Sequence, residues 1–262
     1  MMLFASWCFL KFRKDVAIGI ILFSIFIYFG LTNMPWLPLI LIYGLIGFKI
    51  GGLKLSLTIV ASFLFITFTG VLPQALLSIY LCGIAVIISF ILGSSLGIWA
   101  AHNDKVSAFM RPINDTMQTM PSFVILIPFV MFFGIGEFTA LLAIIAYAFV
   151  PAMRYTEHGL RNLPETVIEA ARMIGCSQTQ LLWKVKIPLA MPVIMLGLNQ
   201  TIMFGLAMLV IAALVGTTGL GQLIYIGLSK ADFGTGMISG VSIALIAIIF
   251  DRTTQAWRIK LE

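Results

Sequence analysis

The chain has 262 residues, of which 61% are hydrophobic and only 10% are charged. Soluble domains are about half apolar and about a quarter charged, and a soluble fold of this length could not hide so much apolar surface. A cytosolic enzyme, a secreted domain and a disordered protein are therefore excluded. The apolar runs are continuous rather than alternating, which favours membrane-spanning helices over a transmembrane β-barrel.

About eight segments are apolar enough to be predicted spans, at roughly 20 residues each. The predicted fold class is therefore all-α, a polytopic membrane helix bundle with about eight transmembrane helices. The predicted spans are 16–33, 36–50, 53–71, 76–101, 121–135, 138–153, 191–215 and 237–255. Three of them (36–50, 121–135 and 138–153) are short, because 15 helical residues rise only about 22 Å. We expect these three to extend into flanking residues or to lie inside the bundle.

The basic residues predict the orientation of the chain. We place the N-terminus in the cytoplasm and the segments between successive spans on alternate sides of the membrane. All but one of the 16 basic residues then fall on the inner side, and only Lys230 falls outside. Cytoplasmic loops are enriched in Lys and Arg, so this segregation supports the assignment. The inner set is Lys11, Arg13, Lys14, Lys49, Lys54, Lys105, Arg111, Arg154, Arg161, Arg172, Lys184, Lys186, Arg252, Arg258 and Lys260.

Ionisable side chains are nearly absent from the predicted spans. Glu137 lies in a turn between two spans, and Asp251 lies at the inner end of the last one. Transporters driven by protons or ions usually carry intramembrane carboxylates or histidines, because such groups are costly there and are kept for function. Their scarcity disfavours an ion-coupled secondary transporter, which is the alternative from another class.

Residues 102–120 form the first polar segment on the inner side. Its apolar residues recur at helical spacing, which predicts a short helix lying on the inner membrane surface. These residues are Val106, Phe109, Met110 and Ile113.

Residues 154–190 form the longest polar segment, also on the inner side, and loops of this length are usually functional or disordered. A first short helix is predicted within it. Pro164 suits the first helical position, Glu165 suits the first turn, where the helix dipole favours an acid, and Gly175 is placed as a C-terminal cap. One face of this helix carries Val167, Ala171 and Ile174, and another carries Glu165, Glu169 and Arg172.

A second short helix is predicted after the glycine bend. Ser177 and Gln180 match a capping box, and the helix is expected to run to about Lys186. Pro188 and Pro192 are expected to end it before the next span. On composition alone, the segment could equally be a surface hairpin that only joins two spans.

The spacing of the residues in this segment resembles the EAA motif of ABC-importer permeases, whose pattern is E-A-A-x3-G-x9-I-x-L-P. The chain differs from that pattern only by Val for Ile and Ile for Leu. The matching residues are Glu169, Ala170, Ala171, Gly175, Val185, Ile187 and Pro188.

Four further stretches resemble the glycine betaine/proline/choline branch of that family. They are Met117-Gln118-Thr119-Met120-Pro121, Phe133-Gly134-Ile135-Gly136, Asn199-Gln200-Thr201-Ile202-Met203 and Val215–Gln222. The resemblance implies a permease core with the five-helix MetI-like fold over residues 76–256, with an EAA coupling loop at 154–190. Residues 1–75 match no motif and would be a peripheral transmembrane region of about three spans.

The family resemblance implies that the chain works as one subunit of a larger transporter. Partners would be two copies of an ABC ATPase, a second and usually identical permease, and a periplasmic or lipid-anchored substrate-binding protein, all at a bacterial inner membrane with no nucleic acid involved. Residues implied in ATPase coupling are Glu165, Glu169, Ala170, Ala171, Gly175, Val185, Ile187 and Pro188. Residues implied in translocation or gating are Met117, Gln118, Pro121, Asn199, Gln200, Gly216, Gly219 and Gly221.

The glycines add two structural expectations. Gly216, Gly219 and Gly221 permit left-handed or tight turns, so the outer segment 216–236 is either an outer gate, a contact for the binding protein or a plain connecting turn. Gly93 and Gly97 are spaced as a helix-packing face and are not assigned to transport.

No cofactor, metal or catalytic group is expected in the chain itself. It lacks the G-x-x-x-x-G-K-[ST] phosphate loop, so ATP and Mg would belong to the partner ATPase. The cysteines Cys8, Cys82 and Cys176 are too scattered for a disulfide framework or a zinc site. The two histidines, His102 and His158, have no neighbouring ligands in sequence, which disfavours a membrane enzyme.

The branch resemblance implies a quaternary-ammonium or related compatible solute, such as glycine betaine, proline betaine, choline or proline. In that branch the aromatic cage for the cation belongs to the binding protein, through cation–π attraction. An ABC permease for taurine, nitrate or methionine is the nearest alternative, since it would share the EAA segment.

Overall fold

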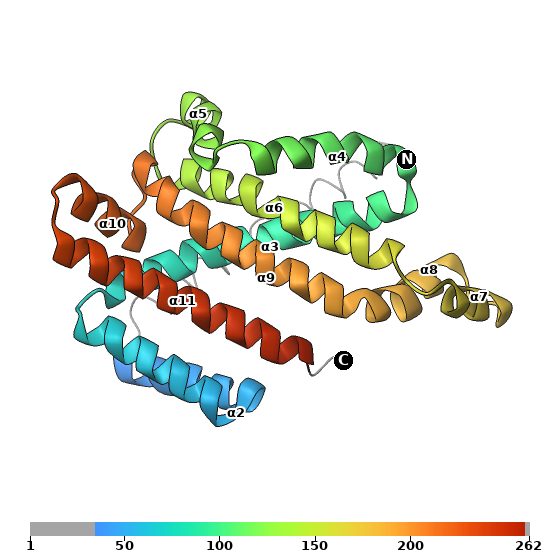
Figure 1. Cartoon of the computed structure of the whole chain (residues 1–262), viewed down its shortest axis with the longest axis horizontal. Coiled ribbons are helices and arrows are strands. Elements are labelled where there is room, and N and C mark those ends of the chain that lie inside the picture. Colours follow the sequence, from blue (N-terminus) through green and yellow to red (C-terminus); the bar gives the residue numbers. More distant parts are fainter. Residues whose placement is uncertain (1–34, 260–262) are drawn as a thin grey trace, which may run out of the picture.

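A computed structural model describes residues 35–259 of the chain (Figure 1). Every regular element in these residues is a helix, which confirms the predicted all-α class. Five helical stretches are long and apolar enough to cross a membrane, and a sixth results if α4 and α5 together form one bent span. The five are α2 (Trp36–Phe68), α3 (Leu72–His102), α6 (Glu137–Arg161), the stretch Gln178–Val215, which contains α9 (Ile187–Ile211), and α11 (Phe233–Ile259). The predicted span 16–33 lies outside the described residues.

Helix α2 folds back on itself. Gly52 has a φ of 73°, which side chains disfavour, and it separates the predicted spans 36–50 and 53–71. The two halves lie side by side, since the hydroxyl of Ser56 donates to the carbonyl oxygen of Gly44 at 2.9 Å. The break between these two predicted segments is therefore confirmed.

Helices α3, α6 and α9 form the centre of the bundle around a shared apolar core. The backbones of α3 and α6 approach closely at two glycines. A β-carbon at Gly93 would lie 2.6 Å from the Cβ of Ala152, and one at Gly97 would lie 2.7 Å from the carbonyl oxygen of Met153. The predicted packing face at Gly93 and Gly97 is therefore confirmed.

The predicted spans 76–101, 138–153 and 237–255 lie within α3, α6 and α11. Helix α6, however, does not end near residue 153 but continues to Arg161. Residues 154–161, which belong to the predicted polar segment, are therefore helical and continue α6. The extra turns carry a Glu157–Arg161 ion pair at helical i,i+4 spacing, which stabilises a helix locally.

The predicted helix within 102–120 is confirmed as α4 (Asp104–Thr119). It packs against the C-terminal part of α6. The side-chain amide of Asn114 donates to the sulfur of Met153 at 3.4 Å. The apolar side chains of Phe109 and Ile113 remain exposed on its outer side.

Helices α4 and α5 (Ser122–Phe133) meet at an angle of 104°. Met120 is extended, with ψ of 133°, because the ring of Pro121 disfavours a helical conformation in the residue before it. Helix α5 has 12 residues and rises only about 18 Å. The predicted span 121–135 is therefore too short to cross a bilayer alone and continues α4 as a bent pair.

The segment 216–236, predicted to lie outside, is not a plain connecting turn, because it contains the helix α10 (Leu220–Ser229). Helix α10 packs closely on the start of α11. A β-carbon at Gly227 would lie 2.6 Å from the amide nitrogen of Gly236. The absence of a side chain at Gly227 allows this contact.

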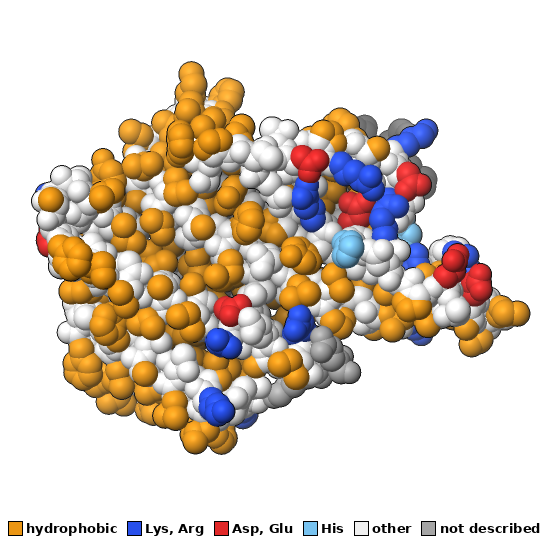
Figure 2. Space-filling view, in the orientation of Figure 1, with side chains coloured by type: hydrophobic (Ala, Val, Ile, Leu, Met, Phe, Trp, Pro, Cys, Tyr) orange, Lys and Arg blue, Asp and Glu red, His pale blue; other side chains and the backbone are white. Residues whose placement is uncertain are grey.

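The two ends of the bundle differ in charge. One end, called here the basic end, holds the bend of α2 at Gly52 and the C-terminal ends of α3, α6 and α11 (Figure 1). Lys230 follows α10 at the opposite end. Figure 2 shows Lys and Arg side chains over the ends of α4, α6 and α7 on the right and over α11 and α2 below, while the left-hand part is mostly hydrophobic.

Candidate functional site

The segment between α6 and α9 projects from the basic end as two helices, at the right of Figure 1. The first is α7 (Glu165–Met173), which confirms the first predicted helix of this segment. Pro164 lies just before its first residue, and Glu165 lies in its first turn.

The end of α7 is built around Gly175. The amide of Gly175 donates to the carbonyl oxygen of Arg172 at 2.9 Å. The amide of Cys176 donates to the carbonyl oxygen of Ala171 at 3.2 Å. These two bonds form a Schellman motif, which requires a left-handed residue, and Gly175 has a φ of 85°. The predicted glycine cap is confirmed.

The second helix begins with the predicted capping box. The hydroxyl of Ser177 accepts from the amide of Gln180 at 3.3 Å, and the side-chain oxygen of Gln180 accepts from the amide of Ser177 at 3.0 Å. The short α8 (Gln178–Gln180) follows, then the π-helical turn η1 (Leu181–Lys186).

The predicted end of this helix at Pro188 and Pro192 is wrong, because η1 runs directly into α9 and both prolines lie inside one continuous helical stretch, Gln178–Val215. The π turn explains the difference. The amide of Ile187 donates to the carbonyl oxygen of Leu182, five residues earlier, instead of the usual four. The backbone hydrogen bonds have therefore already changed register before Pro188, which has no amide hydrogen to donate.

The tip of the projection is apolar and exposed. Met173 and Ile174 are 89% and 83% exposed, whereas Ala171 is only 8% exposed. The predicted apolar face of α7 is therefore not a buried face, since only one of its three members is covered. Glu165, Glu169 and Ala170 are exposed, Val185 and Ile187 are half-buried at the junction with α9, and Pro188 is exposed.

Glu157 and Arg161 hold the base of the projection, and both lie on α6. The residue Glu157 is 9% exposed, and its carboxylate accepts from the hydroxyl of Ser107 at 2.5 Å and from Nε of Arg161 at 3.0 Å. Arg161 also donates to Asp104 at 2.8 Å and to the carbonyl oxygen of Ala100 at 2.7 Å. One carboxylate and one guanidinium thus join α3, α4 and α6.

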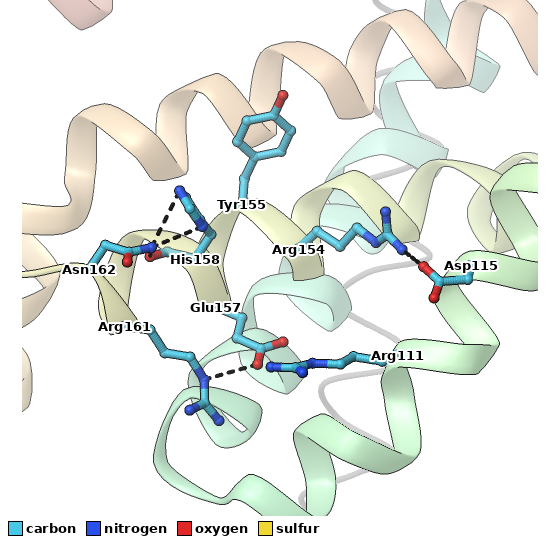
Figure 3. Close-up of a pocket in the computed structure, with 8 residues that line it drawn as sticks. All are labelled: Arg111, Asp115, Arg154, Tyr155, Glu157, His158, Arg161 and Asn162. Atoms are coloured by element: carbon cyan, nitrogen blue, oxygen red, sulfur yellow. Dashed lines mark hydrogen bonds and ion pairs between the residues drawn. The ribbon is translucent and has the colours of Figure 1, made fainter.

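These side chains line a cleft of about 660 Å³ between α4 and α6, drawn in Figure 3. Arg154 pairs with Asp115 and donates to the side-chain oxygen of Gln118 at 2.6 Å. His158 lies on α6 and not in a loop, and the Asn162 side chain bonds to it. At the neighbouring corner, Lys186 lies 3.2 Å from Nε2 of His102, so the start of α9 contacts the end of α3.

Sequence reasoning assigned no role to Glu157 and missed Arg161 as a positioning residue. The available signal was their i,i+4 spacing, which places a carboxylate and a guanidinium on one face of a helix. This spacing carries no weight in a predicted loop, and the predicted span 138–153 ends before both residues.

The predicted gate glycines lie together at the end opposite the projection. Gly216 and Gly219 have φ values of 83° and 119°, and the Oγ of Ser78 on α3 accepts from the amide of Leu220 at 2.9 Å. A β-carbon at Gly221 would lie 3.0 Å from a carbonyl oxygen of α9. The loop between η2 (Ala212–Val215) and α10 is thus fastened to the bundle.

A second contact fastens the same loop to α6. The hydroxyl of Thr218 donates to the carboxylate of Glu137, at the first residue of α6. The amide of Gly136 donates to the carbonyl oxygen of Val215 at 2.9 Å.

The other predicted translocation residues are not brought into one site. The side-chain oxygen of Asn199 accepts from Thr254 at 2.8 Å, and its amide donates to Asp251 at 2.8 Å, which joins α9 to α11. Gln118 instead contacts Arg154 of α6. Met117 packs on the main core, Pro121 marks the α4–α5 bend, and Gln200 is half-buried on α9.

Characterised relatives cover most of the chain. The glycine betaine/proline betaine transport system permease protein ProW of Escherichia coli (strain K12) is 40% identical over 226 residues, 86% of this chain and 64% of ProW. The chain thus spans less than two thirds of ProW. The glycine betaine transport system permease protein OpuAB of Bacillus subtilis (strain 168) is 36% identical over 260 residues, 98% of this chain and 92% of OpuAB.

A solved structure shares the fold. A chain of the MetNI methionine ABC transporter, in an inward-facing conformation, superposes with a TM-score of 0.66 at 19% identity, covering 71% of this chain and 93% of that one. The described residues therefore share their helical fold with a chain of that transporter. The family model described as "Binding-protein-dependent transport system inner membrane component" matches residues 93–254, which is more than half of the sequence. The chain therefore belongs to the family of inner-membrane components of binding-protein-dependent transport systems.

Proposed function

We propose that this chain is the permease subunit of an ATP-driven importer for a quaternary-ammonium or related compatible solute. The candidate solutes are glycine betaine, proline betaine, choline and proline. The relatives ProW, a glycine betaine/proline betaine permease, and OpuAB, a glycine betaine permease, support this substrate class.

The observation that carries the proposal is the projection formed by α7 and α8. It combines a capped, rigid bend with an apolar tip at Met173 and Ile174 that no described residue covers. Exposed apolar side chains at a polar end of a molecule mark contacts with another protein. The tip, with Glu169 and Ala170 beside it, is the surface proposed to meet the ATPase.

The same segment is built to transmit motion. At one end α7 follows α6, whose base is fixed to α3 and α4 through Glu157 and Arg161. At the other end, η1 passes into α9 without a break in the helix. A displacement of the projection would therefore move α6 and α9, the two helices that pack most extensively in the core.

The proposed assembly contains two ATPase copies, a second permease copy and a substrate-binding protein. ATP and Mg belong to the ATPases. Residues 76–256 form the permease core, and residues 1–75 form a peripheral region, giving about eight spans in all. The segregation of basic residues supports placing the basic end and both termini in the cytoplasm.

At the opposite end, the fastened loop at Gly216, Gly219 and Gly221 is proposed as the outer gate. It is tied to α3 by Ser78 and to α6 by Glu137. Movement of α6 would reach this loop directly, so coupling segment and gate would be linked through one helix.

The substrate is tested with the partner binding protein and with cells that express all components. Binding of glycine betaine, choline, proline and taurine is titrated, and uptake of labelled glycine betaine is competed with the same solutes. We expect betaine or choline to bind and compete, and taurine to do neither. Preferential binding of taurine, or uptake that survives ATP depletion but is abolished by an uncoupler, would contradict the proposal.

A further inference from the structure

A second cleft, of about 470 Å³, lies at the basic end between the bend of α2 and the last turns of α11. It is separate from the coupling segment and from the cleft in Figure 3. One part of its wall is apolar, formed by Leu55, Ile248 and Ile259. The other part carries two cations, Lys54 on α2 and Arg252 on α11.

These two cations are not neutralised within the described part of the chain. Lys54 and Arg252 are exposed, and neither forms an ion pair with a described residue. Asp251 is the nearest acid in sequence, but its carboxylate accepts from Asn199 and Gln255 at 2.8 Å each. In the other cleft, by contrast, two of the arginines are paired with acids.

We propose that this cleft binds one anionic glycerophospholipid. Its headgroup phosphate would lie between Lys54 and Arg252, and an acyl chain would lie along Leu55, Ile248 and Ile259. Basic pockets between membrane helices on the cytoplasmic side suit anionic headgroups, because each Lys or Arg there attracts the phosphate. The apolar wall favours a lipid over a free phosphate, because an inorganic anion would leave that wall without a partner.

The bound lipid would add a polar link between α2 and α11, which pack against each other at this end. Lys54 lies just after the bend of α2, and Arg252 lies on the last helix of the core. A phosphate held by both would fix the α2 hairpin against α11. This gives the peripheral hairpin a role as half of a lipid site.

The test is native mass spectrometry of the full-length chain with added phosphatidylglycerol or phosphatidylcholine. We expect one phosphatidylglycerol to be retained in preference to phosphatidylcholine. Lys54→Gln/Arg252→Gln should weaken retention about 30-fold, and each single change about fivefold. The charge-preserving Lys54→Arg/Arg252→Lys should retain the lipid, and both positions are exposed, so folding should be little affected.

The matched control removes two exposed lysines from the same end that do not line the cleft, as Lys105→Gln/Lys184→Gln. It should bind phosphatidylglycerol like the wild type. Equal retention of both lipids, an unchanged affinity in the Lys54/Arg252 double variant, or an equal loss in the control would overturn the proposal. Displacement of the lipid by millimolar inorganic phosphate would also overturn it, since the ligand would then be a free anion.

Discussion

The amide of Cys176 donates a hydrogen bond to the carbonyl oxygen of Ala171 at 3.2 Å, across the left-handed Gly175. This bond closes the end of α7 and turns the chain back toward α8. The relative direction of the two helices of the projection is therefore fixed by the backbone at one residue. Because the projection is proposed to contact the ATPase, its rigidity is a property that mutation can test.

Gly175→Val should place a β-branched side chain at a position with φ of 85°. A left-handed conformation costs such a residue about 1–2 kcal/mol, so the bend should open while the membrane helices stay folded. We expect normal amounts of protein in the membrane, with ATP hydrolysis continuing and uptake per ATP much reduced. Gly175→Asn is the control, since Asn tolerates this conformation; wild-type coupling in Gly175→Val would contradict the account.

Ile174→Ser should weaken binding of the partner ATPase, because the side chain is 83% exposed at the tip and is expected to be buried in the complex. Loss of one such buried apolar side chain should lower the affinity for the ATPase about tenfold or more. Co-purification with the ATPase measures this effect. Leu228→Ser, equally exposed at the opposite end, should bind as the wild type does. Equal effects of the two changes would argue against a docking role for the tip.

Glu157→Ala should destabilise the junction of α4 and α6. It leaves Ser107 and Arg161 without their shared acceptor, a loss of about 1–3 kcal/mol for groups in a largely buried position. Thermal unfolding in detergent checks this prediction. Asp115→Asn is the comparison, because its ion pair with Arg154 is exposed and is worth at most about 1 kcal/mol. A larger effect at Asp115 than at Glu157 would show that the junction is held elsewhere.

Gly219→Ala should disturb the loop at the proposed gate. Its φ is 119°, and a β-carbon would lie 2.6 Å from the Oγ of Ser78. We expect loss of uptake together with lower stability. Gly240→Ala is the matched control, because no other group lies within 4 Å of its β-carbon position and it lies in α11, where Ala is favoured by about 0.5–1 kcal/mol. Normal uptake in Gly219→Ala would remove the loop from the mechanism.

The stability of the protein should depend on pH through Asp232, just before α11. The hydroxyl and amide of Thr235 donate to its carboxylate at 2.7 and 3.2 Å, and these bonds hold the pKa of Asp232 below its ordinary value. Its contribution to stability is therefore complete above the unfolded pKa and is lost as the pH falls through the lower folded pKa. Asp232→Ala should lower the unfolding temperature at neutral pH, and this difference should shrink in acid. A difference that does not change with pH would contradict this origin.

The projection formed by α7 and α8 was predictable because its signals are local. Glycine at 175 and the Ser177–Gln180 pair specify backbone geometry within a few residues, and the structure has both. The break at Gly52 was also predictable, since it lies between two apolar runs. These features depend on the chain near them and not on distant packing.

The errors have tertiary causes. Pro188 was expected to end a helix, but a π turn before it changes the bonding pattern that proline normally breaks. The contact of α4 with α6 could not be predicted either, because the apolar spacing of α4 gives no sign of the polar groups that hold it there. Asn199 was singled out in the sequence, but its partners Asp251 and Thr254 lie more than 50 positions away, so the network could not be read from spacing.

The most direct measurement of the central claim is uptake of labelled glycine betaine into proteoliposomes that contain this chain and its partner ATPase, with the binding protein outside and ATP enclosed. The account predicts accumulation that requires ATP and all three components and that is unaffected by an uncoupler. Accumulation without the ATPase, or driven by an ion gradient in the absence of ATP, would contradict it.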